Sequence, residues 1–234
     1  MKARLFRLAI SAAFLAGSLA VLAAAASSDA IDNPFSALVA IYVTGFIATL
    51  IHEAAHAWMA RKCGAEIDSI AVIPFSYAPK QRKFAFMRYV PSGDIGGYVR
   101  YSYPGDFGTR RDEIAIAAAG PAANFLTAAM LLLAVQAWPL LPQAEKGGAE
   151  TSLVSVAAGQ PPVTGKPAMA LPSQAEIDAI MRDHEARKRA EERSELIAAF
   201  INLLIVVSIV SGILNLLPYR GSDGAIILEH LRWR

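Results

Sequence analysis

The segment His52-Glu53-Ala54-Ala55-His56 has the clearest chemical meaning in this 234-residue sequence. Residues four apart share one face of a helix, so both imidazoles can reach the same ion. Glu53 is turned by about 100° from His52 and can face a water molecule bound to that ion. Two histidines, a third ligand and an open position are typical of catalytic zinc, which lowers the pKa of bound water to about 7. Glu53 would accept the proton of that water.

The position of this motif in the chain strengthens the interpretation. It lies inside an apolar run, residues 34–60, where three ionisable side chains are costly and by default indicate a functional site. The alternative is a buried, hydrogen-bonded histidine pair with Glu53 neutral or hydrogen-bonded. The chain has four histidines and one cysteine, Cys63, which excludes a disulfide within the chain and a cysteine-rich zinc site. A metal would therefore be bound by histidines and carboxylates.

A third ligand is required. In the extended motif H-E-x-x-H-x-x-G-x-x-H the last histidine supplies it, but this chain does not match that motif. Met59 stands where that motif needs glycine and Lys62 where it needs histidine, which excludes a metzincin. The best candidate is Asp223, because Pro218 ends the preceding apolar run and glycines follow, so the chain can fold back. The alternative is that Asp223 only caps a turn. His184 is expected on the opposite side of the membrane, and His230 could reach the cytoplasmic side but follows the last apolar run at a distance.

Two asparagines are candidate substrate-binding groups. Asn124 follows Gly120-Pro121 and is the strongly polar side chain of the run from Ile114 to Val135. It could donate to a substrate carbonyl or to a developing oxyanion. An interhelical hydrogen bond is an equally good explanation for Asn124. Asn215, three residues before Pro218, is expected beside the metal in the same supporting role.

Four apolar runs have to position these residues, at 8–26, 34–60, 114–141 and 196–217. Each is near the roughly 20 residues that a helix needs to cross a bilayer. Hydrophobic residues make up 55% of the chain and charged residues 18%, which argues against an ordinary soluble domain and excludes disorder. We therefore expect an all-α polytopic membrane protein with about four transmembrane helices. Residues 1–26 also resemble a cleavable signal peptide, although a retained helix is favoured.

Charge predicts the orientation of the chain. Residues 61–112 contain nine basic and five acidic side chains, whereas residues 142–195 contain seven basic and nine acidic ones. The positive-inside rule places both termini and residues 61–112 in the cytoplasm and residues 142–195 outside the cell (inner) membrane. A net charge of +2 does not fit nucleic-acid binding, and the apolar runs make the lipid bilayer the expected partner.

The cytoplasmic segment should contain β-structure. Residues 67–75 are rich in β-branched side chains. Residues 96–103 show an alternating pattern and have turn residues on both sides. Both segments therefore indicate short strands of a small membrane-associated sheet. The organisation is then a helix or signal-like segment with an external link (1–33), a first part of the core (34–141), an external linker with a charged helix (142–195), and a second core part with a short cytoplasmic tail (196–234).

At this point the sequence resembles the site-2 proteases, which are intramembrane zinc metalloproteases. The resemblance rests on four motifs in the family's order: the His52–His56 motif, the strand Gly96-Gly97-Tyr98-Val99, Gly120-Pro121-x-x-Asn124, and the segment from Asn215 to Gly224. Together they cover about residues 50–225. Two positions depart from the common pattern: Ser222 replaces a leucine and Ala225 replaces a second glycine. Residues 142–195 are also too few for the PDZ domain that bacterial relatives often carry.

The resemblance implies Zn²⁺ ligands at His52, His56 and Asp223 and a general base at Glu53. It also implies hydrolysis of peptide bonds in or near the transmembrane segments of membrane proteins, as in regulated intramembrane proteolysis. Two other functions remain open at this stage: a metal-binding or transport protein that uses the same three ligands, and a pseudoprotease that binds membrane proteins without cutting them.

Overall fold

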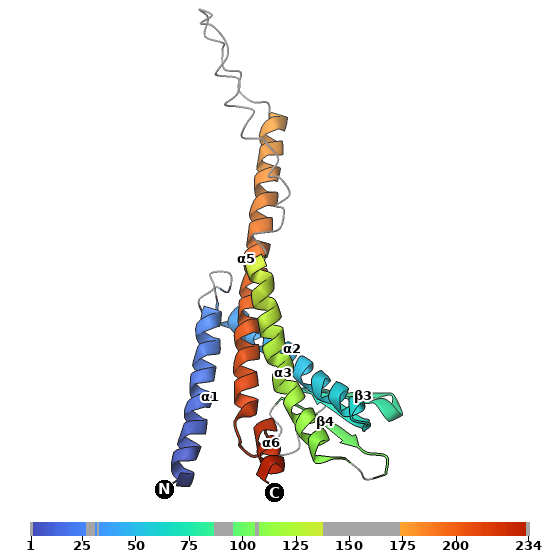
Figure 1. Ribbon diagram of the computed structural model, residues 1–234. Coiled ribbons are helices and arrows are strands. Elements are labelled where there is room, and N and C mark those ends of the chain that lie inside the picture. Colours follow the sequence, from blue (N-terminus) through green and yellow to red (C-terminus); the bar gives the residue numbers. More distant parts are fainter. Residues whose placement is uncertain are drawn as a thin grey trace, which may run out of the picture. The chain divides into compact units, whose positions relative to one another are not determined.

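The structure is a computed structural model that describes residues 2–26, 31, 33–86, 96–105, 108–137 and 174–232. The described chain is mostly helical (Figure 1). It divides into two compact units, Met1–Leu132 with Glu195–Arg234, and Leu133–Ser194. The helices are α1 (Lys2–Ala26), α2 (Pro34–Lys62), α3 (Arg110–Ala137), α5 (Gln174–Leu216) and α6 (Asp223–Arg232).

Four helices within the described ranges are long and apolar enough to cross a membrane, as expected. The candidate spans are Ala9–Ala26, Pro34–Lys62, Arg110–Ala137 and Ile177–Leu216. The fourth span and the charged helix expected before it form one continuous helix of 43 residues, α5. The expected linker before α5 falls on residues outside the described part.

The helix α2 has well-defined ends. Asn33 caps it, because the Asn33 side chain accepts a hydrogen bond from the Ser36 amide at 2.8 Å, and Pro34 occupies the first turn. At the other end Gly64, with φ +83°, lets the chain leave the helix. Between them, small side chains allow close packing: Ala40 and Ala48 are buried in one cluster with residues of α1 and α5. The helix that carries the two histidines is thus held by packing on its neighbours.

The sheet has four antiparallel strands in the order β3-β2-β1-β4, where the sequence predicted two. The strands are β1 (Glu66–Val72), β2 (Phe75–Ala78), β3 (Lys83–Phe86) and β4 (Gly97–Ser102). The strand expected at 67–75 is divided near Pro74, and β4 agrees with the strand expected at 96–103. β3 was missed because it has four residues and begins in a charged segment, so alternation is not detectable.

One half of this sheet packs directly on α2. Ile67 of β1 is buried in a cluster with Ala57 and Ala60 of α2 and Ile116 of α3, and Val99 of β4 packs against the same cluster. β1 and β4 pair in register through the partners Ile70 with Val99 and Ala71 with Tyr98. The packing brings β4 alongside the turn of α2 that carries Glu53.

Candidate metal centre and catalytic cavity

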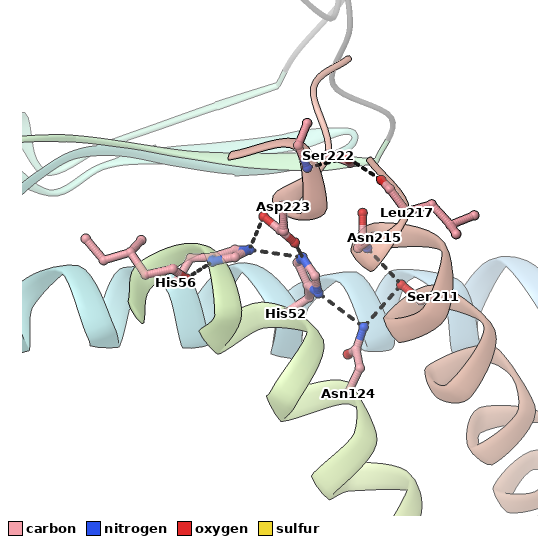
Figure 2. Close-up of polar contacts among 10 residues, drawn as sticks. His52, His56, Asn124, Ser211, Asn215, Leu217, Ser222 and Asp223 are labelled. Atoms are coloured by element: carbon pink, nitrogen blue, oxygen red, sulfur yellow. Dashed lines mark hydrogen bonds and ion pairs between the residues drawn. The ribbon is translucent and has the colours of Figure 1, made fainter. Parts of the chain in front are cut away.

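Three side chains with metal-binding atoms meet where α2 and α6 approach each other. The Nε2 atoms of His52 and His56 lie 3.0 Å apart. His52 Nε2 is 3.0 Å from Asp223 Oδ2, and His56 Nε2 is 3.3 Å from Asp223 Oδ1 (Figure 2). All three residues are buried or nearly so. Among the described residues, this is the group of histidine and acidic side chains compact enough to bind one metal ion.

The donor atoms fit a zinc ion. Zinc–ligand distances of about 2.0–2.1 Å in a tetrahedron place neighbouring ligands about 3.3–3.4 Å apart, close to the separations observed. The Nδ1 atom of His56 lies 2.6 Å from the carbonyl oxygen of Ile116. Because a carbonyl oxygen only accepts, this Nδ1 carries the proton and Nε2 keeps a free electron pair toward Asp223. The two imidazoles and one carboxylate leave a position open, which is the catalytic arrangement.

A glycine on α3 makes room for the histidine pair. A Cβ atom at Gly120 would collide with His56 Nε2 and would lie 2.6 Å from His52 Nε2. The backbone of α3 therefore lies directly against both imidazole rings. Glycine is required there for space, which explains the small residue in the Gly120-Pro121 motif.

A tight turn brings Asp223 to the histidines. α5 ends at Leu216, Gly221 adopts φ +87°, and Asp223 is the first residue of α6. The Ser222 hydroxyl lies 2.5 Å from the Leu217 carbonyl and accepts from the Ala225 amide at 3.1 Å. Ser222, one of the two departures from the family pattern, thus caps α6 and fixes the turn immediately before Asp223.

The electrostatic environment keeps Asp223 ionised. Burial opposes ionisation, but when the imidazoles of His52 and His56 are protonated, their hydrogen bonds and charges outweigh it and hold the pKa of the Asp223 carboxyl below its usual value. A carboxylate, not a carboxylic acid, is the form that binds a metal ion.

Glu53 faces a cavity beside the histidines. The cavity has a volume of about 200 Å³ and its lining includes Glu53, His52 and His56, together with residues of β4 and the turn before α6. Glu53 is 6% exposed, and a Cβ atom at Gly97 would lie 2.8 Å from its Oε1 atom. Gly97 of β4 therefore leaves space for the Glu53 carboxylate. His52, Glu53 and His56 thus all line the same cavity.

The two asparagines lie in different places. Asn215 lines the cavity together with Ser211. Asn124 is fully buried, does not line the cavity, and lies with its amide 3.2 Å from Nδ1 of His52, the ring nitrogen opposite the metal-binding Nε2. Of the two asparagines, Asn215 lies on the cavity wall and Asn124 lies behind His52. Sequence reasoning missed Ser211, because a single serine in an apolar run carries no signal of its own.

The other candidate ligands are not members of this group. Nδ1 of His230 is 2.9 Å from the Ile226 carbonyl within α6. Cys63 caps the end of α2 and packs against the cluster around Ile67. His184 lies on the charged part of α5, and none of these three belongs to the group of His52, His56 and Asp223.

A helical chain with four candidate spans and a two-histidine, one-carboxylate centre beside a glutamate defines a class: multi-pass membrane proteins with a metallopeptidase-type site. The family model of Peptidase family M50 matches residues 36–234, so the chain belongs to this family of site-2-type zinc metallopeptidases. No curated protein and no solved structure matches the chain. The resemblance expected from the motifs is thereby confirmed.

Proposed function

We propose that this protein is an intramembrane zinc endopeptidase that cleaves peptide bonds in or near transmembrane segments of membrane proteins. The observation that carries the proposal is the meeting of His52, His56 and Asp223 at one edge of a cavity that also contains Glu53. His52, His56 and Asp223 would hold the ion. Bound there, zinc supplies Lewis-acid polarisation and a more acidic water molecule.

The residues of the chain have distinct tasks in this reaction. The Glu53 carboxylate accepts a proton from the attacking water and returns it to the leaving amine. Asn215, on the cavity wall, is placed to donate a hydrogen bond to the substrate carbonyl or its oxyanion. Burial of Glu53 among the helices keeps bulk water from competing for these contacts.

β4 is suited to bind an extended substrate. It is the last strand in the sheet order, pairs with β1, and contributes Gly97, Tyr98 and Val99 to the cavity wall. A helical substrate has its carbonyls hydrogen-bonded and must unwind before cleavage. Among the described strands, β4 has β1 on one side and no strand on the other. Pairing of the unwound segment with that outer edge would satisfy its backbone groups and present one carbonyl to the metal centre.

The metal ligands can be tested by zinc analysis of purified variants. His52→Ala, His56→Ala and Asp223→Ala should each lose stoichiometric zinc, because a three-ligand site loses most of its affinity with one ligand. His230→Ala and Cys63→Ser should retain it. Full zinc occupancy in Asp223→Ala would contradict the ligand assignment.

Glu53→Gln separates a protease from a metal transporter or a non-cleaving homologue. The amide cannot act as a base, so cleavage should fall by about 10²-fold or more while zinc stays bound. Membrane proteomes of cells with wild type and Glu53→Gln are compared for uncut substrates, with the exposed Glu66→Gln as the matched control. Identical proteomes, with metal flux dependent on His52, would favour transport.

We further infer that both termini and the sheet face the cytoplasm. The charge excess of residues 61–112 and four candidate spans support this orientation. In a Cys63→Ser background, Gly165→Cys should react with an impermeant thiol reagent in intact cells, and Ala85→Cys should not. The opposite labelling would invert the topology.

A further inference from the structure

The two histidines of the proposed metal centre are supported in different ways. Nδ1 of His56 has an unambiguous acceptor, the Ile116 carbonyl at 2.6 Å. Nδ1 of His52 instead lies 3.2 Å from the side-chain amide of Asn124. That amide is 3.1 Å from Ser211 Oγ, and Ser211 Oγ is 3.4 Å from the Asn215 amide nitrogen. Figure 2 shows this chain of polar groups running from His52 through α3 to α5.

The orientation of the Asn124 amide decides what His52 can do. With the amide nitrogen toward His52, Nδ1 must accept, and a neutral ring then carries its proton on Nε2, which cannot bind a metal in that form. With the amide oxygen toward His52, Nδ1 donates and Nε2 is free for the ion. Amide oxygen and nitrogen exchange places by a half-turn, so the hydrogen-bond network has to assign them.

The remaining contacts of Asn124 do not oppose this half-turn. Asn124 is fully buried, and its Oδ1 atom has no hydrogen-bond partner in the described structure. A half-turn leaves one amide atom unpaired as before. It also places the oxygen toward Ser211, whose hydroxyl can donate as well as accept.

We propose that Asn124 is a positioning residue for His52. Its amide oxygen accepts the Nδ1 proton of His52 and the Ser211 hydroxyl proton, which keeps the imidazole in the metal-binding tautomer and aims Nε2 at Asp223. This inference rests on the proposed zinc site. It assigns Asn124 a role on the side of the ring away from the cavity, in place of a contact with the substrate oxyanion.

The test is the zinc affinity of the full-length protein in detergent, measured by competition with a chelator in a Glu53→Gln background. Outer-shell partners of histidine ligands typically change affinity by about 10–100-fold. Asn124→Leu, similar in volume but without an acceptor, should lose affinity in this range. Asn124→Asp, whose carboxylate accepts the same proton, should remain within about threefold of wild type. Equal affinities for Asn124→Leu and wild type would overturn the proposal, and so would equal losses in both variants.

A second pair of variants covers the case that Asn124→Leu does not fold. Ser211→Ala removes one hydrogen bond that orients the amide and should weaken zinc binding several-fold. Ser208→Ala is its matched control, because Ser208 is a buried serine of the same helix whose hydroxyl has no partner in the described structure. If the two serine variants bind zinc equally, Asn124 is not held by Ser211 for this purpose and the proposal fails.

Cobalt-substituted protein gives a readout that a packing role would not affect. Wild type should show two exchangeable, paramagnetically shifted imidazole N–H resonances, one from each histidine ligand. Asn124→Leu should lose the one from His52 through exchange with water, whereas Asn124→Asp should keep both. Retention of both signals in Asn124→Leu would overturn the assignment. If wild type binds neither zinc nor cobalt, the proposed function fails instead.

Discussion

The two halves of the sheet differ in what covers them. β1 and β4 pack on α2 and bury Ile67, and β4 contributes residues to the cavity wall. β2 and β3 instead expose Phe84 and Phe86, to 71% and 69%, and the Phe84 ring lies against Tyr77 of the same hairpin, with centroids 5.8 Å apart. The inner half, β1 and β4, is thus held by packing on α2, and we expect changes there to reach the site. The outer hairpin, β2 and β3, meets α2 through the rings of Phe75 and Phe46, with centroids 6.0 Å apart, and we expect changes at its exposed side chains to affect the site little.

The largest expected effect comes from a side chain added to the inner half. In Gly97→Ala the new Cβ would lie 2.7 Å from the Ala71 carbonyl oxygen and 2.8 Å from Glu53 Oε1, so the carboxylate has to move. Cleavage should fall by about 10²-fold or more, while zinc remains bound because no ligand is touched. Gly45→Ala is the control, since a Cβ at Gly45 meets nothing within 4 Å. Wild-type turnover in Gly97→Ala would show that the inner half tolerates change.

The second largest effect is expected on the free energy of unfolding. Ile67 is 4% exposed in the cluster that joins β1 to α2 and α3, and Ile67→Ala should lower the free energy of unfolding by about 2–4 kcal/mol. Thermal unfolding in detergent measures the loss. A cost below about 1 kcal/mol would mean that this half of the sheet is not anchored by its packing.

A smaller effect is expected where β4 is joined to α3 by a polar contact. Tyr101 Oη donates to Glu113 Oε2 at 2.7 Å, and burial together with this bond raises the pKa of Tyr101 above its usual value. Tyr101→Phe should lower the free energy of unfolding by about 1 kcal/mol. Tyr77→Phe, on the outer hairpin, is the matched variant and should cost less. Equal melting temperatures for both would remove this part of the contrast.

The smallest effect is expected on the outer hairpin. Phe84→Ser removes an exposed ring from β3 and should change the free energy of unfolding by less than about 0.5 kcal/mol, with zinc affinity unchanged. A loss as large as that of Ile67→Ala would show that the aromatic side chains of the hairpin stabilise the core.

Much of the helical architecture could be read from the sequence. The four apolar runs predict the four candidate spans because crossing a bilayer requires about 20 apolar residues, a length that is visible in the chain. The sheet was harder to predict from the sequence. β4 alternates clearly, but β2 and β3 have four residues each, and their pairing depends on β1, which periodicity alone does not reveal. Short strands are stabilised by their neighbours rather than by their own sequence.

The sequence by itself determined which side chains could do the chemistry. His52 and His56 share a helical face through a spacing of four, and Asp223 follows a proline and glycine that allow the chain to turn back. Only the tertiary structure decided how they meet. The Ser222 cap fixes the start of α6, and α3 approaches closely enough at Gly120 to touch both rings. The Ser222 cap is a local contact, but the approach of Gly120 to the two rings joins residues far apart in the chain, and local spacing carries no information about it.

The same holds for the two asparagines, which sequence reasoning treated alike. Both are polar side chains near a proline in an apolar run. Packing of α3 against α2 and α5 buries Asn124 behind His52, whereas the end of α5 leaves Asn215 on the cavity wall. Whether a polar group meets the metal ligand or the substrate depends on the rotation and depth of its helix. Those are set by the packing of neighbouring helices, so residue type and spacing could nominate both asparagines but not separate their roles.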